Sequence, residues 1–87
     1  MSDEKSMLEE MISSLKRQRD ELALQIHLGK AEAKDEYDRA RQRLDQMLED
    51  YEPVKDALGD SAENVYASLK LVGEELLRSF RRVRDAL

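Results

Sequence analysis

Gly59-Asp60-Ser61 separates two long amphipathic segments and decides how the chain folds. Glycine suits the left-handed position that ends a helix, and Asp60 with Glu63 three residues later has the spacing of a capping box. The sequence therefore predicts a helix end, a short turn at residues 59–61, and a second helix over about residues 62–87.

The segment before this turn carries an apolar seam. From Leu58 back to Tyr37, apolar residues recur at alternating steps of four and three, which is coiled-coil spacing. The steps from Tyr37 to Ala33 and from Ala33 to Gly29 are both four, which is a stutter, and the seam then continues toward the N-terminus. We therefore predict one long helix over about residues 3–58. Pro53 lies inside it, and the sequence leaves open whether Pro53 kinks the helix or ends it.

The segment after the turn carries a matching seam. If the two segments fold back on each other, facing residues such as Tyr51 and Leu69, or Ala40 and Phe80, have numbers that all add up to 119 or 120. Large residues tend to face small ones in this register, as dense packing requires. The predicted fold is all-α: an antiparallel helical hairpin in a single domain, residues 1–87. The predicted hairpin seam consists of Ala40, Leu44, Met47, Tyr51, Val65, Leu69, Val72, Leu76 and Phe80.

The first predicted helix extends roughly 45 Å beyond this hairpin, at 1.5 Å per residue. Its apolar residues there meet nothing in the hairpin, and a lone amphipathic helix is marginal in water. Leu24, Leu28 and Ala31 form a second stripe nearly opposite Leu22 and Ile26, typical of a helix between several neighbours. We therefore expect this arm to pair with the arms of other copies, in a homodimer or a tetramer. The sequence leaves open whether the paired arms run parallel or antiparallel. The predicted oligomer interface consists of Leu8, Ile12, Leu15, Leu22, Leu24, Ile26 and Leu28.

Charge is distributed unevenly along the chain. The net charge is −5, yet Arg78, Arg81, Arg82 and Arg84 make the C-terminal end basic. The acidic total disfavours a nucleic-acid partner, because neutralising phosphates needs a dominant basic surface. The predicted register places the arginines beside acidic residues of the first helix, so ion pairs within the chain explain their presence. They also form a candidate patch for an unidentified acidic protein partner.

Membrane-surface binding is the alternative function. Residues 76–84 combine apolar and basic side chains, as interfacial helices do, although the hairpin seam already uses Leu76 and Phe80. No apolar run approaches the roughly 18–20 residues that cross a bilayer. Residues 1–5 lack the apolar core of a signal peptide. We therefore expect a cytoplasmic protein.

Residue types that carry catalysis or bind metals are scarce. The chain has no cysteine and one histidine, His27, which lacks the Glu-x-x-His spacing of helix-borne metal sites. The glycines are scattered, unlike those of a phosphate-binding loop. The serines have no candidate base beside them. We therefore expect no enzymatic activity, no cofactor and no metal site.

Two short segments support a resemblance. AEAKDEY at residues 31–37, then a charged heptad region, then GDSAE at residues 59–63, resemble small bacterial coiled-coil proteins loosely described as stress-response or apolipoprotein-like. The chain departs from that pattern at Pro53 and in lacking tryptophans in its second helix, where Tyr66 and Phe80 are the nearest aromatics. The resemblance implies a small cytoplasmic helical protein of unassigned biochemical role, with a stress-related role as one candidate, and it implies no site residues. The predicted function is a non-enzymatic, self-associating coiled-coil structural or interaction protein.

Overall fold

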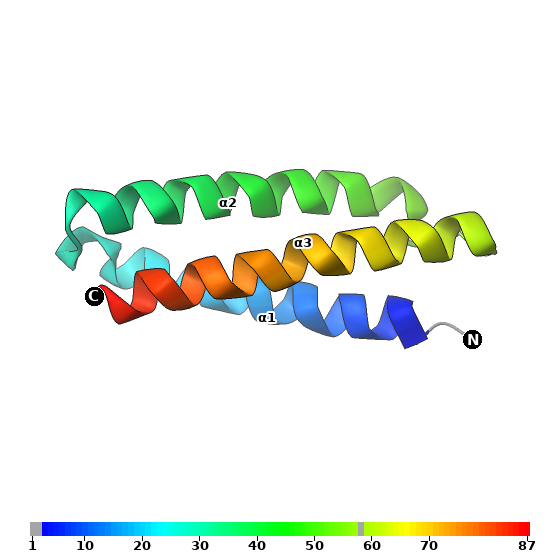
Figure 1. Cartoon of the computed structure of the whole chain (residues 1–87), viewed down its shortest axis with the longest axis horizontal. Coiled ribbons are helices and arrows are strands. Elements are labelled where there is room, and N and C mark those ends of the chain that lie inside the picture. Colours follow the sequence, from blue (N-terminus) through cyan, green and yellow to red (C-terminus); the bar gives the residue numbers. More distant parts are fainter. Residues whose placement is uncertain (1–2, 58) are drawn as a thin grey trace.

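Three α-helices pack against one another in the part of the chain that the structure describes. The computed structural model describes residues 3–57 and 59–87. Figure 1 shows α1 and α3 running in the same direction, with α2 antiparallel to both. The bundle is elongated, with Cα extents of 45 × 17 × 17 Å. Its elements are α1 (Asp3–Gln25), the 3₁₀ turn η1 (Ile26–Leu28), α2 (Ala31–Tyr51), the 3₁₀ turn η2 (Glu52–Val54) and α3 (Asp60–Asp85).

The long helix predicted over residues 3–58 is divided in the structure. Gly29 and Lys30 have extended backbones, with ψ angles of 160° and 168°, so the chain reverses there. The physical reason is packing, because the reversal lays the apolar stripe of α1 along α3 of the same chain. Burying this stripe stabilises the fold more than continuing the helix through two further residues would. The prediction of one unbroken helix is therefore wrong at this point.

Most of the predicted oligomer interface is instead the core of the bundle. Leu8 and Leu15 are fully buried, and Ile12 and Leu22 are at most 6% exposed. Ile26 is half-buried against the same core. The premise that α1 meets nothing in its own chain is therefore wrong. Among the predicted interface residues, Leu24 and Leu28 are the exposed ones.

The predicted seam of the second half is buried. Arg82 pairs with Glu36 at 2.6 Å and Arg43 with Glu75 at 3.0 Å, so α2 and α3 lie within two residues of the predicted register. Leu58, which begins the predicted seam, lies outside the described residues. The seam residues Ala40, Leu44, Met47, Tyr51, Leu69, Leu76 and Phe80 are buried, and Val65 and Val72 are partly buried.

The reversal between α2 and α3 begins at Pro53. Since α2 ends at Tyr51 and Pro53 lies in η2, the proline follows a helix end and does not kink a continuous helix. Gly59 has a φ of 105°, a backbone conformation that side chains disfavour. The predicted capping box does not form, because Asp60 is already the first residue of α3. The backbone N–H of Glu63 donates to the Gly59 carbonyl at 3.1 Å instead.

Tyr66 fastens this turn to α3. It is only 2% exposed, although the predicted seam did not include it. Its hydroxyl donates to the carbonyl of Val54 and lies 3.1 Å from that of Ala57. Its ring packs against Tyr51 with centroids 6.2 Å apart. The turn is therefore held by backbone conformation and by a buried side chain together.

Gly73 lets α1 approach α3 closely. It is buried in α3, and a Cβ placed there would lie 2.1 Å from the Sδ atom of Met11 on α1. Helix α1 lies farther from α2, and the Tyr37 side chain reaches across that gap to the Arg19 carbonyl. The bundle is therefore asymmetric, with α3 as the helix that both others pack against.

Substitution at Gly73 tests this close approach. Alanine is favoured over glycine inside a helix by about 1 kcal/mol, but here its Cβ would collide with Met11. Met11→Ala removes the colliding atoms. We expect Gly73→Ala to be more favourable in the Met11→Ala background than in the native chain, by at least about 1 kcal/mol. Urea unfolding followed by circular dichroism measures both effects, and equal effects in the two backgrounds would contradict the packing described.

Candidate interaction surface

Exposed leucines gather at the end of the bundle where α1 connects to α2. Leu24 on α1 is 77% exposed and Leu28 in η1 is 69% exposed. Leu87, 37% exposed, lies at the same end, because a Cβ placed on Gly29 would be 2.8 Å from its Cδ2 atom. We call Leu24, Leu28 and Leu87 the leucine end. Exposed apolar groups of this kind mark interaction surfaces more often than isolated leucines do.

The sequence predicted part of this surface. Leu24 and Leu28 were expected on a stripe opposite the seam of the first helix, and they do point away from the core. Ala31, the third member of that stripe, is exposed but belongs to α2, beyond the reversal. In the predicted register, residue numbers that add up to 120 put Leu87 opposite Ala33. Its position beside Gly29 depends on the reversal, which the spacing of apolar residues did not reveal.

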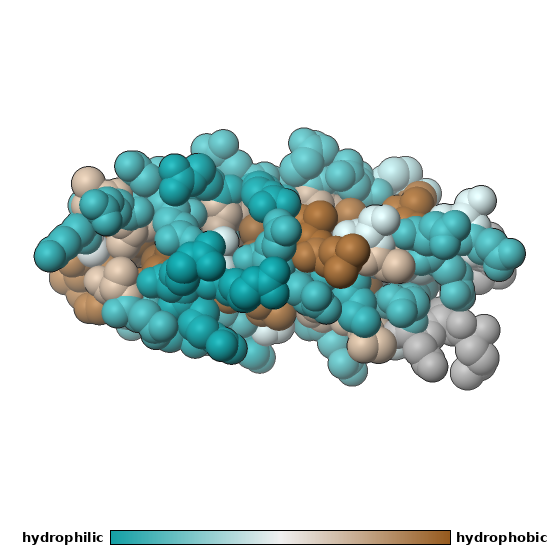
Figure 2. Space-filling view, viewed as in Figure 1, coloured by the Kyte–Doolittle hydropathy of each residue, from teal (hydrophilic) through white to brown (hydrophobic). Residues whose placement is uncertain are grey.

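Hydrophilic side chains cover most of the flank seen in Figure 2, apart from a small apolar patch over the middle of α3. Leu71 is the exposed large apolar residue of α3, at 64%. Met7 on α1 is 45% exposed, and its sulfur lies 4.0 Å from the Lys70 ammonium. Leu71 thus resembles Leu24 in exposure but not in position, and it serves as a matched control.

A groove of about 220 Å³ runs between α2 and α3. It is lined by Glu36, Arg39, Ala40, Arg43, Ser79 and Arg82. The Arg82 guanidinium is held by the Glu36 carboxylate at 2.6 Å and donates to the Ser79 hydroxyl at 3.1 Å. Arg43 pairs with Glu75, outside the groove lining, at 3.0 Å. Two of the three arginines are therefore engaged by acidic side chains of the same chain.

The predicted acidic-partner patch is partly used within the bundle. Arg78, Arg81, Arg82 and Arg84 are all exposed. Arg82 pairs with Glu36, as the predicted register requires, and Arg84 donates to the Gln18 amide oxygen of α1 at 3.4 Å. The patch therefore ties α3 to both of its neighbours.

The C-terminal segment presents no apolar face while the bundle is folded. Leu76 is 1% exposed, and Phe80 and Val83 are fully buried. Interfacial helices bind membranes by placing such residues in the lipid. Among the described residues, no helix combines the length and the apolar character that spanning a bilayer requires.

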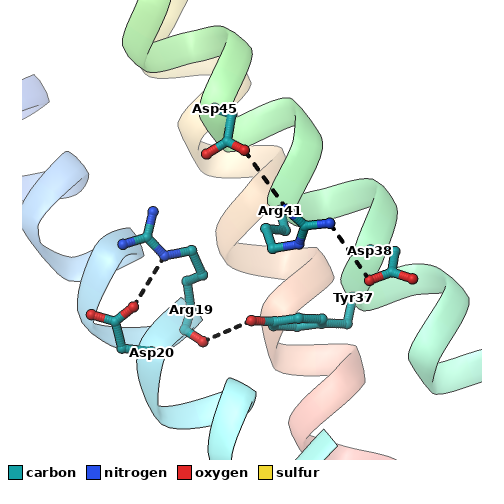
Figure 3. A network of polar contacts seen from close by, with 6 residues as sticks. All are labelled: Arg19, Asp20, Tyr37, Asp38, Arg41 and Asp45. Atoms are coloured by element: carbon teal, nitrogen blue, oxygen red, sulfur yellow. Dashed lines mark hydrogen bonds and ion pairs between the residues drawn. The ribbon is translucent and has the colours of Figure 1, made fainter.

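A polar network joins α1 to α2 (Figure 3). The Tyr37 hydroxyl of α2 donates to the backbone carbonyl of Arg19 at 3.0 Å. The Arg19 side chain pairs with Asp20 at 3.2 Å, and Arg41 lies 3.9 Å from Asp38. Burial raises the pKa of Tyr37, while the charges of Arg41 and Arg19 lower it. The Tyr37 hydrogen bond crosses between the two helices, and each of the ion pairs lies within one helix.

Tyr51 has a buried hydroxyl without a hydrogen-bond partner among the described residues. Burial, and to a smaller degree the nearby Glu9 carboxylate, together raise the pKa of Tyr51 to about 12. Glu9 lies outside hydrogen-bonding geometry in the structure, so we regard burial as the dominant cause. In residues 3–57 and 59–87, no three His, Asp or Glu side chains are grouped as a metal site requires.

Comparisons of the chain with models of protein families, with curated proteins and with solved structures found no match. The resemblance to small bacterial coiled-coil proteins stays a prediction. The stress-related role that it implies stays a prediction as well.

Raising the pH tests the burial of Tyr51. A tyrosine has a pKa of about 10 in the unfolded chain, so the unfolded state loses this proton before the folded state does. The stability that depends on the protonated Tyr51 is therefore complete below pH 10 and is lost as the pH rises toward 12. We expect Tyr51→Phe to lose less free energy of unfolding over this range than the native chain, as measured by urea unfolding at several pH values. Parallel losses in the two proteins would contradict the burial.

Proposed function

We propose that this chain is a non-enzymatic interaction protein that works by self-association through the leucine end. The observation that supports this most is the exposure of Leu24 and Leu28, 77% and 69%, at one end of the bundle. Leu87, which lies against Gly29, adds a partly exposed leucine at the same end. A second copy offers an identical surface, and a two-fold contact brings each leucine group against the other.

Charge favours contact at the end over contact along the flanks. Each copy carries a net charge of −5, so two bundles placed side by side repel each other. An end-to-end arrangement keeps most of the charged side chains apart. The surface is small compared with the roughly 1,200–2,000 Å² that stable complexes bury. We therefore expect a reversible, concentration-dependent association.

Membrane-surface binding has less support. It needs Leu76, Phe80 and Val83 on the surface, and all three are buried against the other helices. The arginines of the same segment engage Glu36 and Gln18. Binding to lipid would therefore require α3 to leave the bundle.

Substitutions at the leucine end test self-association. In sedimentation equilibrium, we expect the average mass of the native chain to rise above 10.1 kDa with concentration. The double variant Leu24→Gln/Leu28→Gln removes apolar surface from the contact, so its dissociation constant should be at least about tenfold larger. Glutamine has good helix propensity, so α1 should persist.

Leu71→Gln is the matched control. It removes a similarly exposed leucine from the flank of α3, and we expect it to associate like the native chain. A native chain that stays at the monomer mass throughout would contradict the proposed function. The same holds if the control and the double variant weaken association equally.

A further inference from the structure

The connection between α1 and α2 is held by few interactions. Gly29 and Lys30 leave helical geometry through their ψ angles of 160° and 168°. The Gly29 N–H donates to the Ile26 carbonyl at 3.0 Å. No side chain caps η1 at Gln25 or α2 at Lys30, and lysine is not among the residues that cap helices well. Nothing in residues 26–30 prevents a continuous helix, since none is proline and none has a positive φ.

The other reversal differs in each respect. It contains Pro53, which cannot continue a helix, and Gly59, whose φ is 105°. The buried Tyr66 hydroxyl bonds its carbonyls. Of the two reversals, the one at Gly29 and Lys30 is therefore the one that can straighten while α2 and α3 stay packed.

The apolar seam continues through this connection. Leu22, Ile26, Gly29 and Ala33 follow one another at steps of four, three and four, which keeps them on one face if the helix is continuous. A monomer that reverses at Gly29 does not need this continuity. Two long helices lying antiparallel face to face do need it, because each must present the same face to the other along its whole length.

The contacts between α1 and α2 are centred on the same connection. Arg19 and Tyr37 share a hydrogen bond, and Leu28 lies midway between them in the sequence. Glu9 and Tyr51 lie near each other, and Lys30 lies midway between them in the sequence. If the same contacts formed between two antiparallel copies, residues 28–30 of one copy would meet residues 28–30 of the other. A two-fold axis would therefore pass through Gly29, the residue that best permits a close approach.

We propose that two copies meeting at the leucine end exchange α1. Residues 3–51 of each copy become one continuous helix, and each α1 packs on α2 and α3 of the partner copy. Leu8, Ile12, Leu15 and Leu22 then make the same contacts as in the monomer, now between chains. Exchange of an identical element is a low-cost route to a dimer, because it preserves the core. The inference rests on the proposed self-association, which brings the two connections together.

Spin labels report which chain supplies α1. The chain has no cysteine, so Met7→Cys/Lys70→Cys can be labelled selectively. The two native side chains lie 4.0 Å apart, and in an unexchanged bundle the labels stay below about 20 Å apart, because neighbouring helices lie about 10 Å apart. After exchange, labels on one chain are about 65 Å apart, because roughly 43 residues of continuous helix separate them. Doubly labelled chain is unfolded and refolded with excess unlabelled chain, and the dimer fraction is measured by pulsed electron paramagnetic resonance.

Two variants at the connection should act in opposite directions. Gly29→Ala favours a continuous helix at both connections of a dimer, and we expect it to lower the dissociation constant roughly 30-fold. Lys30→Pro suits the φ of −74° at this position but cannot occupy the interior of a continuous helix. It should therefore preserve the monomer fold and association at the leucine end, and abolish the long label distance.

The outcomes separate the two proposals. A long intrachain distance in the native dimer that Lys30→Pro removes supports the exchange. A dimer with only the short distance overturns the exchange and leaves self-association at the leucine end standing. A monomer at all concentrations, for both the native chain and Gly29→Ala, overturns both.

Discussion

The apolar stripe of α1 must be covered, and α3 covers it. Leu8 and Leu15 are fully buried against the bundle core, and the path of the chain follows from that contact. Gly73 opens α3 to Met11 so that the two helices can approach closely. The reversal at Gly29 and Lys30 exists because a straight helix would leave the stripe in water. Burying each of its leucines stabilises the fold by about 1.5–3 kcal/mol. The local backbone at the reversal is therefore set by packing some distance away.

The two reversals illustrate different ways of ending a helix. Between α2 and α3, Pro53 and the positive φ of Gly59 prevent helix continuation. Between α1 and α2, residues 26–30 are compatible with a helix, and only tertiary packing favours the bend. Local preference and global fold agree at the first reversal and conflict at the second. A conflict of this kind gives a sequence two ways to bury the same core, within one copy or between two.

The sequence predicted the fold well where local signals and packing agree. The steps of four and three over residues 33–54 and 62–83 identified the buried faces of α2 and α3, and the sums of residue numbers gave their register. The stripe of Leu8 and Leu15 was also recognised as needing a neighbour. The predicted neighbour was a second copy and the actual neighbour is α3, because a seam that continues through Gly29 indicates one helix. The two successive steps of four, from Tyr37 to Ala33 and from Ala33 to Gly29, are the irregularity in the spacing that lies beside the reversal.

Residues whose role depends on the turns were harder to predict. Tyr66 lies beside a seam position, and its hydroxyl bonds to Val54 and Ala57 could not be read from spacing. Leu24 and Leu28 were expected at an interface, whereas Leu87 joins them only because the chain reverses. Small-angle X-ray scattering of the chromatographically isolated monomer tests that reversal most directly. We expect a radius of gyration close to the 14.0 Å of the bundle. A monomer with a maximum dimension of roughly 84 Å or more, the length of one helix over residues 3–58, would contradict it.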